Sequence, residues 1–204
     1  AVHRGIHALK DQGFVRYQLG KRMVQITTEC RDRFQGGKHT PEGIDKIAQA
    51  VEQVLKSRRV QCDMAILSDE GDFRIVETTA AERDGADEAF FDSDLASAAL
   101  SLFTPLEVAK ISSRIIAKSS TRGSGEVQRE FLDRYRQAGY QGYLWDPDLR
   151  EFSFPVSRIS GQSIAIRFWS QANTMRNLTS HLALIEQLHI ISPTLFPNTP
   201  QYNA

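Results

Sequence analysis

The segment REFSFPVSRISGQSIAIRFW, residues 150–169, decides the fold. Residues 150–156 and 163–169 are rich in aromatic and β-branched side chains, which is typical of strands, and Ser160-Gly161-Gln162 between them is typical of a turn. The segment therefore predicts a β-hairpin.

Alternation of side chains along these strands separates the two faces of the predicted sheet. An all-apolar face, expected to form core beneath helices, contains Ile164, Ile166 and Phe168. The opposite face contains Ser163, Ala165, Arg167 and Trp169, and the pattern leaves open whether it meets solvent or a ligand pocket. On the paired strand, one face is predicted to carry Arg150, Phe152 and Phe154.

A second hairpin and several helices complete the expected domain. Strands are predicted at 60–67 and 73–78 around an acidic turn at 69–72. Helices are predicted from an N-cap at Thr40 to about residue 59, over 95–103, from Thr104 to about 118, over 127–138 with Gly139 as the stop, and from about 177 to 191. This order predicts an α+β fold, an antiparallel sheet with packed helices.

The first 38 residues differ from the rest in charge. They contain eight Lys or Arg against three acidic residues, although the whole chain has 25 of each and no net charge. A helix with Val2, Ile6 and Leu9 on one side is expected to stop at Gly13. A strand over 14–19 and a second helix from Lys21 through Ile26 are expected to follow. Helix, stop, strand and helix are typical of the back half of a winged helix-turn-helix.

Composition and residue spacing further restrict the classes of function that the chain can have. A nucleic-acid binder is usually basic overall, so a DNA-binding role must lie in the local basic segment. No apolar run approaches the roughly 20 residues that span a bilayer, so no membrane association is expected. Cys30 and Cys62 show no metal-ligand spacing, which predicts reduced thiols and no metal site. The chain begins as helix interior without a cap, which predicts a start further upstream.

Several motifs together resemble one family. The N-terminal string AVHRGIHALKDQGFVRYQLG is similar to the end of the winged helix-turn-helix of IclR-type bacterial transcription regulators, where T-V-H-R, G-F-V and Y-x-L-G recur. FLDRYRQAGY resembles the family's helix ending in R-x-x-G-Y, and SDLASAALSLFTP resembles its small-residue helix followed by proline. The hairpin of residues 152–169 resembles the family's A-A-P-V hairpin.

The resemblance implies a partial winged helix-turn-helix at 1–22, a linker helix and loop at 23–40, a GAF-like effector-binding domain at 41–192 and a flexible tail at 193–204. The sequence departs from the family pattern in two ways. It lacks the first two helices of the DNA-binding domain, and its wing is short. Ser97 replaces the family's glycine, and 80–93 is unusually acidic.

On the DNA side, the resemblance makes residues 1–12 the recognition helix. Base edges would face Val2, His3 and Arg4, since the N-terminal residues of such a helix enter the major groove. Arg4 suits a phosphate or guanine O6 and N7. Arg16 and Lys21 are expected at phosphates. The alternative is a solvated basic helix.

On the ligand side, the resemblance assigns the effector position to Phe152, Arg167 and Trp169, more weakly to Arg150, with Ala96 and Ser97 on the small-residue helix. Tyr143 lies in the loop leading in. An Arg fork binds a carboxylate and aromatic walls suit a planar ligand, so a small carboxylate such as an aromatic acid is predicted. The alternative is that Arg167 is a surface residue that pairs with a nearby acid.

The predicted function is therefore a transcription regulator that binds double-stranded operator DNA and a small organic acid and controls a catabolic operon. The alternative is a ligand-sensing or dimerisation module without DNA binding of its own. No nucleophile, triad or glycine-rich phosphate loop stands out, so no catalytic residue, cofactor or enzyme activity is predicted. A cytoplasmic homodimer, or a tetramer built from it, is expected because such readers pair on two half-sites.

Overall fold

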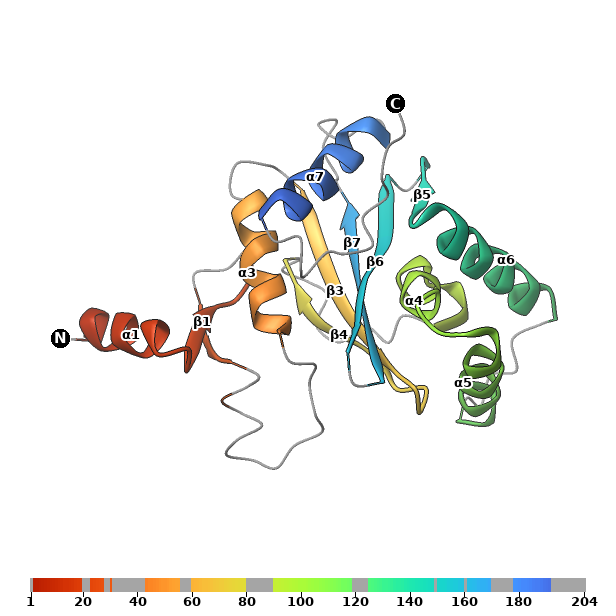
Figure 1. The fold of residues 1–204 in the computed structure, drawn as a ribbon, viewed down its shortest axis with the longest axis horizontal. Helices are drawn as coiled ribbons and strands as arrows, with labels where there is room; N and C mark the ends of the chain where they lie inside the picture. The colour runs from red at the N-terminus through yellow and green to blue at the C-terminus, as the bar shows by residue number, and fades with distance from the viewer. Residues whose placement is uncertain are drawn as a thin grey trace.

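The computed structural model describes residues 2–19, 23–27, 30, 43–55, 60–79, 90–118, 125–148, 150–159, 161–169 and 178–191. At its centre lies a five-stranded antiparallel sheet in the order β4-β3-β7-β6-β5 (Figure 1). The strands are β3 Gln61–Ser68, β4 Phe73–Thr78, β5 Leu144–Asp146, β6 Glu151–Ile159 and β7 Gln162–Trp169. Both predicted hairpins are confirmed, and β3 and β7 join them along the middle of the sheet.

Helices cover both faces of this sheet (Figure 1). One face carries α3 Ile44–Leu55 and α7 Leu178–Ile191. The other carries α4 Asp94–Leu100, α5 Pro105–Lys118 and α6 Gly125–Gln141, with the 3-10 turn η1 Phe90–Asp92 leading into α4. The predicted α+β class is confirmed.

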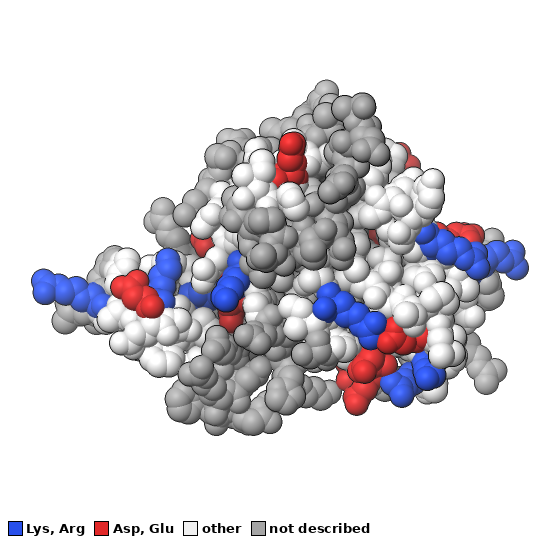
Figure 2. All heavy atoms as spheres, in the orientation of Figure 1, with Lys and Arg blue, Asp and Glu red and all other residues white. Residues whose placement is uncertain are grey.

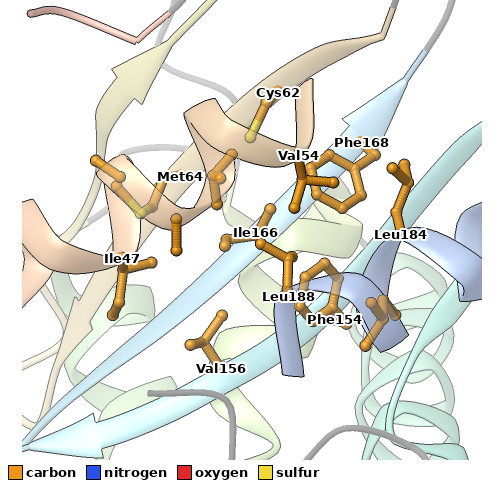
Figure 3. Close-up of a cluster of buried hydrophobic side chains, with 14 of the residues drawn as sticks. Ile47, Val54, Cys62, Met64, Phe154, Val156, Ile166, Phe168, Leu184 and Leu188 are labelled. Atoms are coloured by element: carbon orange, nitrogen blue, oxygen red, sulfur yellow. The ribbon is translucent and has the colours of Figure 1, made fainter. Parts of the chain in front are cut away.

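The core is divided by the sheet into two clusters of buried side chains. Figure 3 shows the first, in which Met64, Ile166 and Phe168 of the sheet pack against Ile47 and Val54 of α3 and against α7. The second contains Ala65, Leu67 and Ala165 of the sheet with residues of α4, α5 and α6. The predicted alternation along 163–169 is confirmed, because its even-numbered residues enter the first cluster and Ala165 enters the second.

Helix α4 consists mostly of small residues because it lies flat against the sheet. Ala96, Ala98 and Ala99 are fully buried against Ala65 and Ala165. The helix begins at the N-cap Ser93, whose Oγ accepts a hydrogen bond from the backbone of Ala96 at 3.1 Å. Such caps satisfy one of the otherwise unpaired N–H groups of the first turn.

The N-terminal elements project from this body (Figure 1). Helix α1 Val2–Asp11 ends as predicted at Gly13, whose φ is 76°. Strands β1 Val15–Tyr17 and β2 Val24–Ile26 pair antiparallel, and we call them the N-terminal strand pair. The helix predicted from Lys21 is therefore wrong for 24–26, where Val24 and Ile26 satisfy their backbone groups by pairing with β1.

Two further boundaries differ from the prediction. Helix α6 continues through Gly139 to Gln141 and is followed by Gly142, whose φ of 76° ends it. Strand β5 was expected to be a loop, and it pairs with β6 through an Asp-Pro-Asp turn in which the Asp148 backbone donates to Asp146 Oδ1 at 2.8 Å. The predicted N-cap Thr40, the loop at 31–40, the acidic 80–89 and the tail at 193–204 lie outside the described residues.

Across the parts of the chain that the structure describes, no helix combines the length and apolarity needed to cross a membrane.

Candidate functional site

A buried ion pair lies on the face of the sheet that carries α4. Arg167 on β7 is 2% exposed and Asp63, its cross-strand neighbour on β3, is fully buried. Arg167 donates from Nε and Nη2 to the same oxygen, Asp63 Oδ2, at 3.2 and 2.8 Å. The guanidinium that the sequence analysis assigned to an effector carboxylate therefore engages a carboxylate of the protein.

Other polar groups surround this pair. Thr78 Oγ1 on β4 donates to the second carboxylate oxygen of Asp63 at 2.7 Å, and Glu151 Oε2 on β6 lies 3.5 Å from Arg167 Nη1. Ser153 is in register with Arg167, is 1% exposed, and its Oγ has no hydrogen-bond partner within the described ranges. We call these five residues the polar cluster. The 3.5 Å contact of Nη1 with Glu151 is longer than the two contacts of the guanidinium with Asp63.

The aromatic candidates are divided between the two faces of the sheet. Phe152 is fully buried in the first core cluster, and Tyr143 stacks on it with ring centroids 5.1 Å apart. Trp169 follows the alternation of Arg167, is half-buried and is in register with Glu151. The structure therefore does not bring Phe152 and Tyr143 together with Arg167, because Phe152 pairs with Phe168 and points to the opposite side.

The remaining ligand candidates lie in the turn before β6 and on helix α4. Arg150 is half-buried and has a φ of 55°, so it belongs to the turn before β6 and the alternation of that strand does not extend to it. Ala96 and Ser97 are fully buried on α4, and Ser97 Oγ donates to the Ser93 carbonyl of its own helix at 3.1 Å.

Cys62 lies next to the polar cluster in sequence but on the other face. Burial raises the pKa of its thiol well above the ordinary value, and the charges of Asp63 and Glu77 raise it further, with a partial opposing effect of Arg167. A thiol held in this way is a packing residue, since thiolate is the reactive form.

On the DNA side, Arg16 does not lie where the sequence analysis placed it. It is 2% exposed and forms ion pairs with Asp45 of α3, at 2.5 Å from Nε to Oδ1, and with Glu77 of β4. Gln25 Nε2 on β2 donates to the same Glu77 oxygen at 2.9 Å. We call Arg16, Gln25, Asp45 and Glu77 the Arg16 cluster. The prediction of a phosphate contact for Arg16 is wrong in this structure, because its side chain points into the body of the protein.

Burial alone would lower the pKa of Arg16. The hydrogen bonds and charge of Glu77, and then those of Asp45, outweigh burial and hold the pKa above its ordinary value. The guanidinium therefore remains charged in its buried position.

The other DNA candidates lie on or near the projecting helix α1. Arg4 is exposed there, and Figure 2 shows basic side chains along this projection. Val2 and His3 belong to α1, but their side chains, like all of Lys21, lie outside the described structure. Leu9, Met23 and Ile26 are exposed large hydrophobic residues of the same region, at 43%, 62% and 53%.

Sequence reasoning missed Asp63, Asp45 and Glu77, the three acids that hold Arg167 and Arg16. One signal was present for Asp63, a single charge inside the apolar run CDMAIL. A buried charge requires a partner, so this position predicts a cation on a neighbouring strand. Asp45 and Glu77 sit in ordinary amphipathic patterns and carried no such signal.

Metal ligation has no candidate within the described residues, where no group of three or more His, Cys, Asp and Glu is arranged to hold an ion.

The chain is similar to known proteins in its fold. No protein-family profile and no curated protein sequence matches the chain. Solved structures do match, among them an IclR family transcriptional regulator from Brucella abortus, with a TM-score of 0.54 and 14% identity over 94% of this chain and 78% of that one. A transcriptional regulator from Alicyclobacillus acidocaldarius matches with a TM-score of 0.53 and 10% identity over 97% and 84%.

The match also holds for an effector domain alone. The effector domain of a regulator described as IclR, from Acinetobacter sp. ADP1, covers 74% of this chain and 95% of its own length, with a TM-score of 0.50 and 16% identity. At these identities the likeness establishes the fold, which is that of IclR-type regulators.

Proposed function

We propose that the chain is an IclR-type transcription regulator in which helix α1 contacts operator DNA and the sheet domain responds to a small-molecule effector. The observation that carries the proposal is the fold, which is similar to that of such regulators over 94% and 97% of the chain. The solved neighbours are regulators and not enzymes, and we extend this reading to the present chain. Control of a catabolic operon, as the sequence analysis predicted, belongs to this proposal.

DNA contact is proposed at the exposed side of α1. Arg4 is exposed near the N-terminus of the helix, the end from which a recognition helix reaches base edges. Arg16 acts differently, because its charge is already satisfied within the protein. We therefore propose Val2, His3, Arg4 and Lys21 as DNA-facing residues and remove Arg16 from that set.

A gel shift of the complete protein on its upstream intergenic DNA tests this half of the proposal. Arg4→Ala is expected to weaken binding by roughly tenfold or more, as loss of a bidentate base contact costs about 1–3 kcal/mol. Arg136→Ala, an exposed change on α6, is the matched control and is expected to leave affinity unchanged. Equal affinity of the Arg4 variant and the control would remove α1 from the interface.

The effector is proposed to be a small carboxylate such as an aromatic acid, bound at the polar cluster with Arg167, Trp169 and the α4 residues Ala96 and Ser97. Arg150, Phe152 and Tyr143 would then support the site from the turn and the opposite core. The Nη1 edge of Arg167 is the position proposed for the carboxylate, because its 3.5 Å contact with Glu151 is longer than the 3.2 and 2.8 Å contacts of Nε and Nη2 with Asp63.

Calorimetry with a panel of benzoates and short aliphatic acids tests this half. Glu151→Gln is expected to tighten binding of an acid several-fold, because a competing negative charge beside Nη1 is removed. Arg158→Gln, which changes an arginine near the other end of the hairpin, is the control. Unchanged or weaker binding in Glu151→Gln would exclude the Nη1 edge as the carboxylate position.

The alternative function is a sensing or dimerisation module that does not bind DNA. It is favoured by the exposed apolar side chains of Leu9, Met23 and Ile26, which are typical of a contact surface with protein. The same gel shift separates the two functions. A cytoplasmic homodimer or tetramer belongs to the main proposal, and light scattering of the complete protein measures it.

A further inference from the structure

The N-terminal strand pair is fixed to the sheet domain by a buried charge cluster. Arg16 binds α3 through Asp45 and β4 through Glu77, and Gln25 adds a second bond from β2 to Glu77. Leu19 enters the first core cluster at 2% exposure. Removal of one partner by mutation would leave a buried charge uncompensated, so the cluster depends on all of its members.

Helix α1 in turn is fixed to the strand pair. The Phe14 backbone donates to the Leu9 carbonyl at 2.9 Å, and Thr27 Oγ1 donates to the Gly13 carbonyl at 2.8 Å. The Lys10 ammonium lies 4.9 Å from the centroid of the Tyr17 ring. The position of the strand pair therefore sets the position of α1.

The Arg16 cluster also adjoins the polar cluster, although the two lie on opposite faces of the sheet. Glu77, which holds Arg16, is followed directly by Thr78, whose hydroxyl holds Asp63. Asp63 in turn holds Arg167. The ladder between β3 and β4 changes register between Met64 and Ala65, beside Glu77, so the two strands are irregularly paired at this point.

We propose that these contacts couple the polar cluster to the N-terminal strand pair, with Arg16 as the positioning residue for α1. A change at Asp63 that weakens its bond to Thr78 shifts the end of β4, and Glu77 then holds Arg16 and Gln25 in a different position. Coupling requires that a change at one cluster stabilise one of two arrangements of the β3–β4 pair more than the other, and we place that element at the irregular pairing between Met64 and Ala65. The consequence for DNA rests on the proposed function, whereas the coupling itself does not.

Hydrogen exchange of the complete protein, without DNA, tests the coupling. Thr78→Val keeps the shape of the side chain and removes the hydroxyl. It is expected to lower the protection of the amides of β1 and β2 by at least about fivefold, within the usual range of coupling between sites. Thr78→Ser keeps the hydroxyl and is expected to restore protection.

The matched control is Thr79→Val. Thr79 is the next residue, and its hydroxyl bonds to Gln61 and to the Cys62 backbone, with no bond to Asp63. The control removes a hydroxyl at the same end of β4 without touching the Asp63–Thr78 bond, and it is expected to leave the protection of β1 and β2 unchanged. Equal effects of the two valine variants on β1 and β2, or no effect of either, would overturn the coupling.

A second test applies if Thr78→Val does not fold. It makes the change at Arg16 and measures the effect at the polar cluster. Arg16→Lys keeps the charge but replaces the forked guanidinium with a single ammonium group. It is expected to lower protection at the Met64 and Arg167 amides, because coupling acts in both directions. Unchanged protection there contradicts the proposal. A gel shift then separates the two hypotheses: a wild type that binds no DNA ends the proposed function and leaves the exchange result intact.

Discussion

Arg158 and Glu107 form a two-pronged ion pair, in which Nη2 and Nη1 of the arginine lie 2.6 and 3.0 Å from Oε1 and Oε2 of the glutamate. The pair joins β6 to the first turn of α5. Glu107 also closes a capping box, since its carboxylate accepts from the backbone and the hydroxyl of Thr104 at 2.8 Å. The Arg158 guanidinium, finally, lies 4.3 Å from the centroid of the Phe103 ring.

Glu107 should therefore make stability depend on pH. Hydrogen bonds from Arg158, followed by those from Thr104, lower its pKa from 4.5 to about 2. Because the folded pKa lies below the unfolded one, the stabilisation is complete above pH 4.5 and is lost as the pH falls through about 2. Urea unfolding of wild type and Glu107→Gln should differ at pH 7 and converge toward pH 2. In Arg158→Gln, the pKa of Glu107 measured by NMR should rise, and an unchanged value would assign the shift to Thr104 alone.

Removing one partner of the buried Arg167–Asp63 pair should be costly. Arg167→Met leaves Asp63 fully buried without its cation, and breaking a buried pair costs about 3–5 kcal/mol. The double variant Asp63→Leu with Arg167→Met should recover much of that loss, because both charges of the pair are then removed. The control is Arg136→Met, which breaks the exposed pair with Asp133 and should cost less than about 1 kcal/mol in urea unfolding.

Enlarging a side chain on α4 should destabilise the fold. Ala98 is fully buried in the second core cluster, and extra methyl groups in a packed core cost about 1–3 kcal/mol. Ala98→Leu should therefore lower the unfolding free energy by this amount. Ala109→Leu places the same side chain at an exposed position of α5 and should change it by less than about 0.5 kcal/mol. If Ala98→Leu left the unfolding free energy unchanged, α4 would have to move away from the sheet at little cost.

The two thiols should differ in reactivity. Cys62 is fully buried with a raised pKa, whereas Cys30 is half-buried. An Ellman titration of the native protein should therefore modify Cys30 first, and Cys30→Ser should react only after unfolding in urea. Rapid reaction of the native Cys30→Ser variant would show that the first core cluster opens readily.

The sequence predicted local features better than partners. The hairpins, the alternation of residues 163–169 and the Thr104 start of α5 follow from patterns within a few residues, and all are present. Residues 24–26 were assigned to a helix because three apolar positions do not distinguish helix from strand without their partner. The roles of Arg16 and Arg167 depend on acids distant in the chain, Glu77 and Asp63, which no local pattern connects to them. The effector and DNA assignments remain predictions.

The central pairing of β3 with β7 also has a consequence for the route of folding. The β3–β4 and β6–β7 hairpins each close a short loop, whereas Asp63 and Arg167 are separated by 104 positions in the chain. Closure of so long a loop is entropically costly before its contacts repay it, so the hairpins should form early and their association late. Asp63 and Arg167 then lose their hydration only in this last step. The edge strands of both hairpins are unpaired until the hairpins join. Hydrogen exchange of their backbone amides, and association between molecules through these edges, should therefore be greatest just before that step.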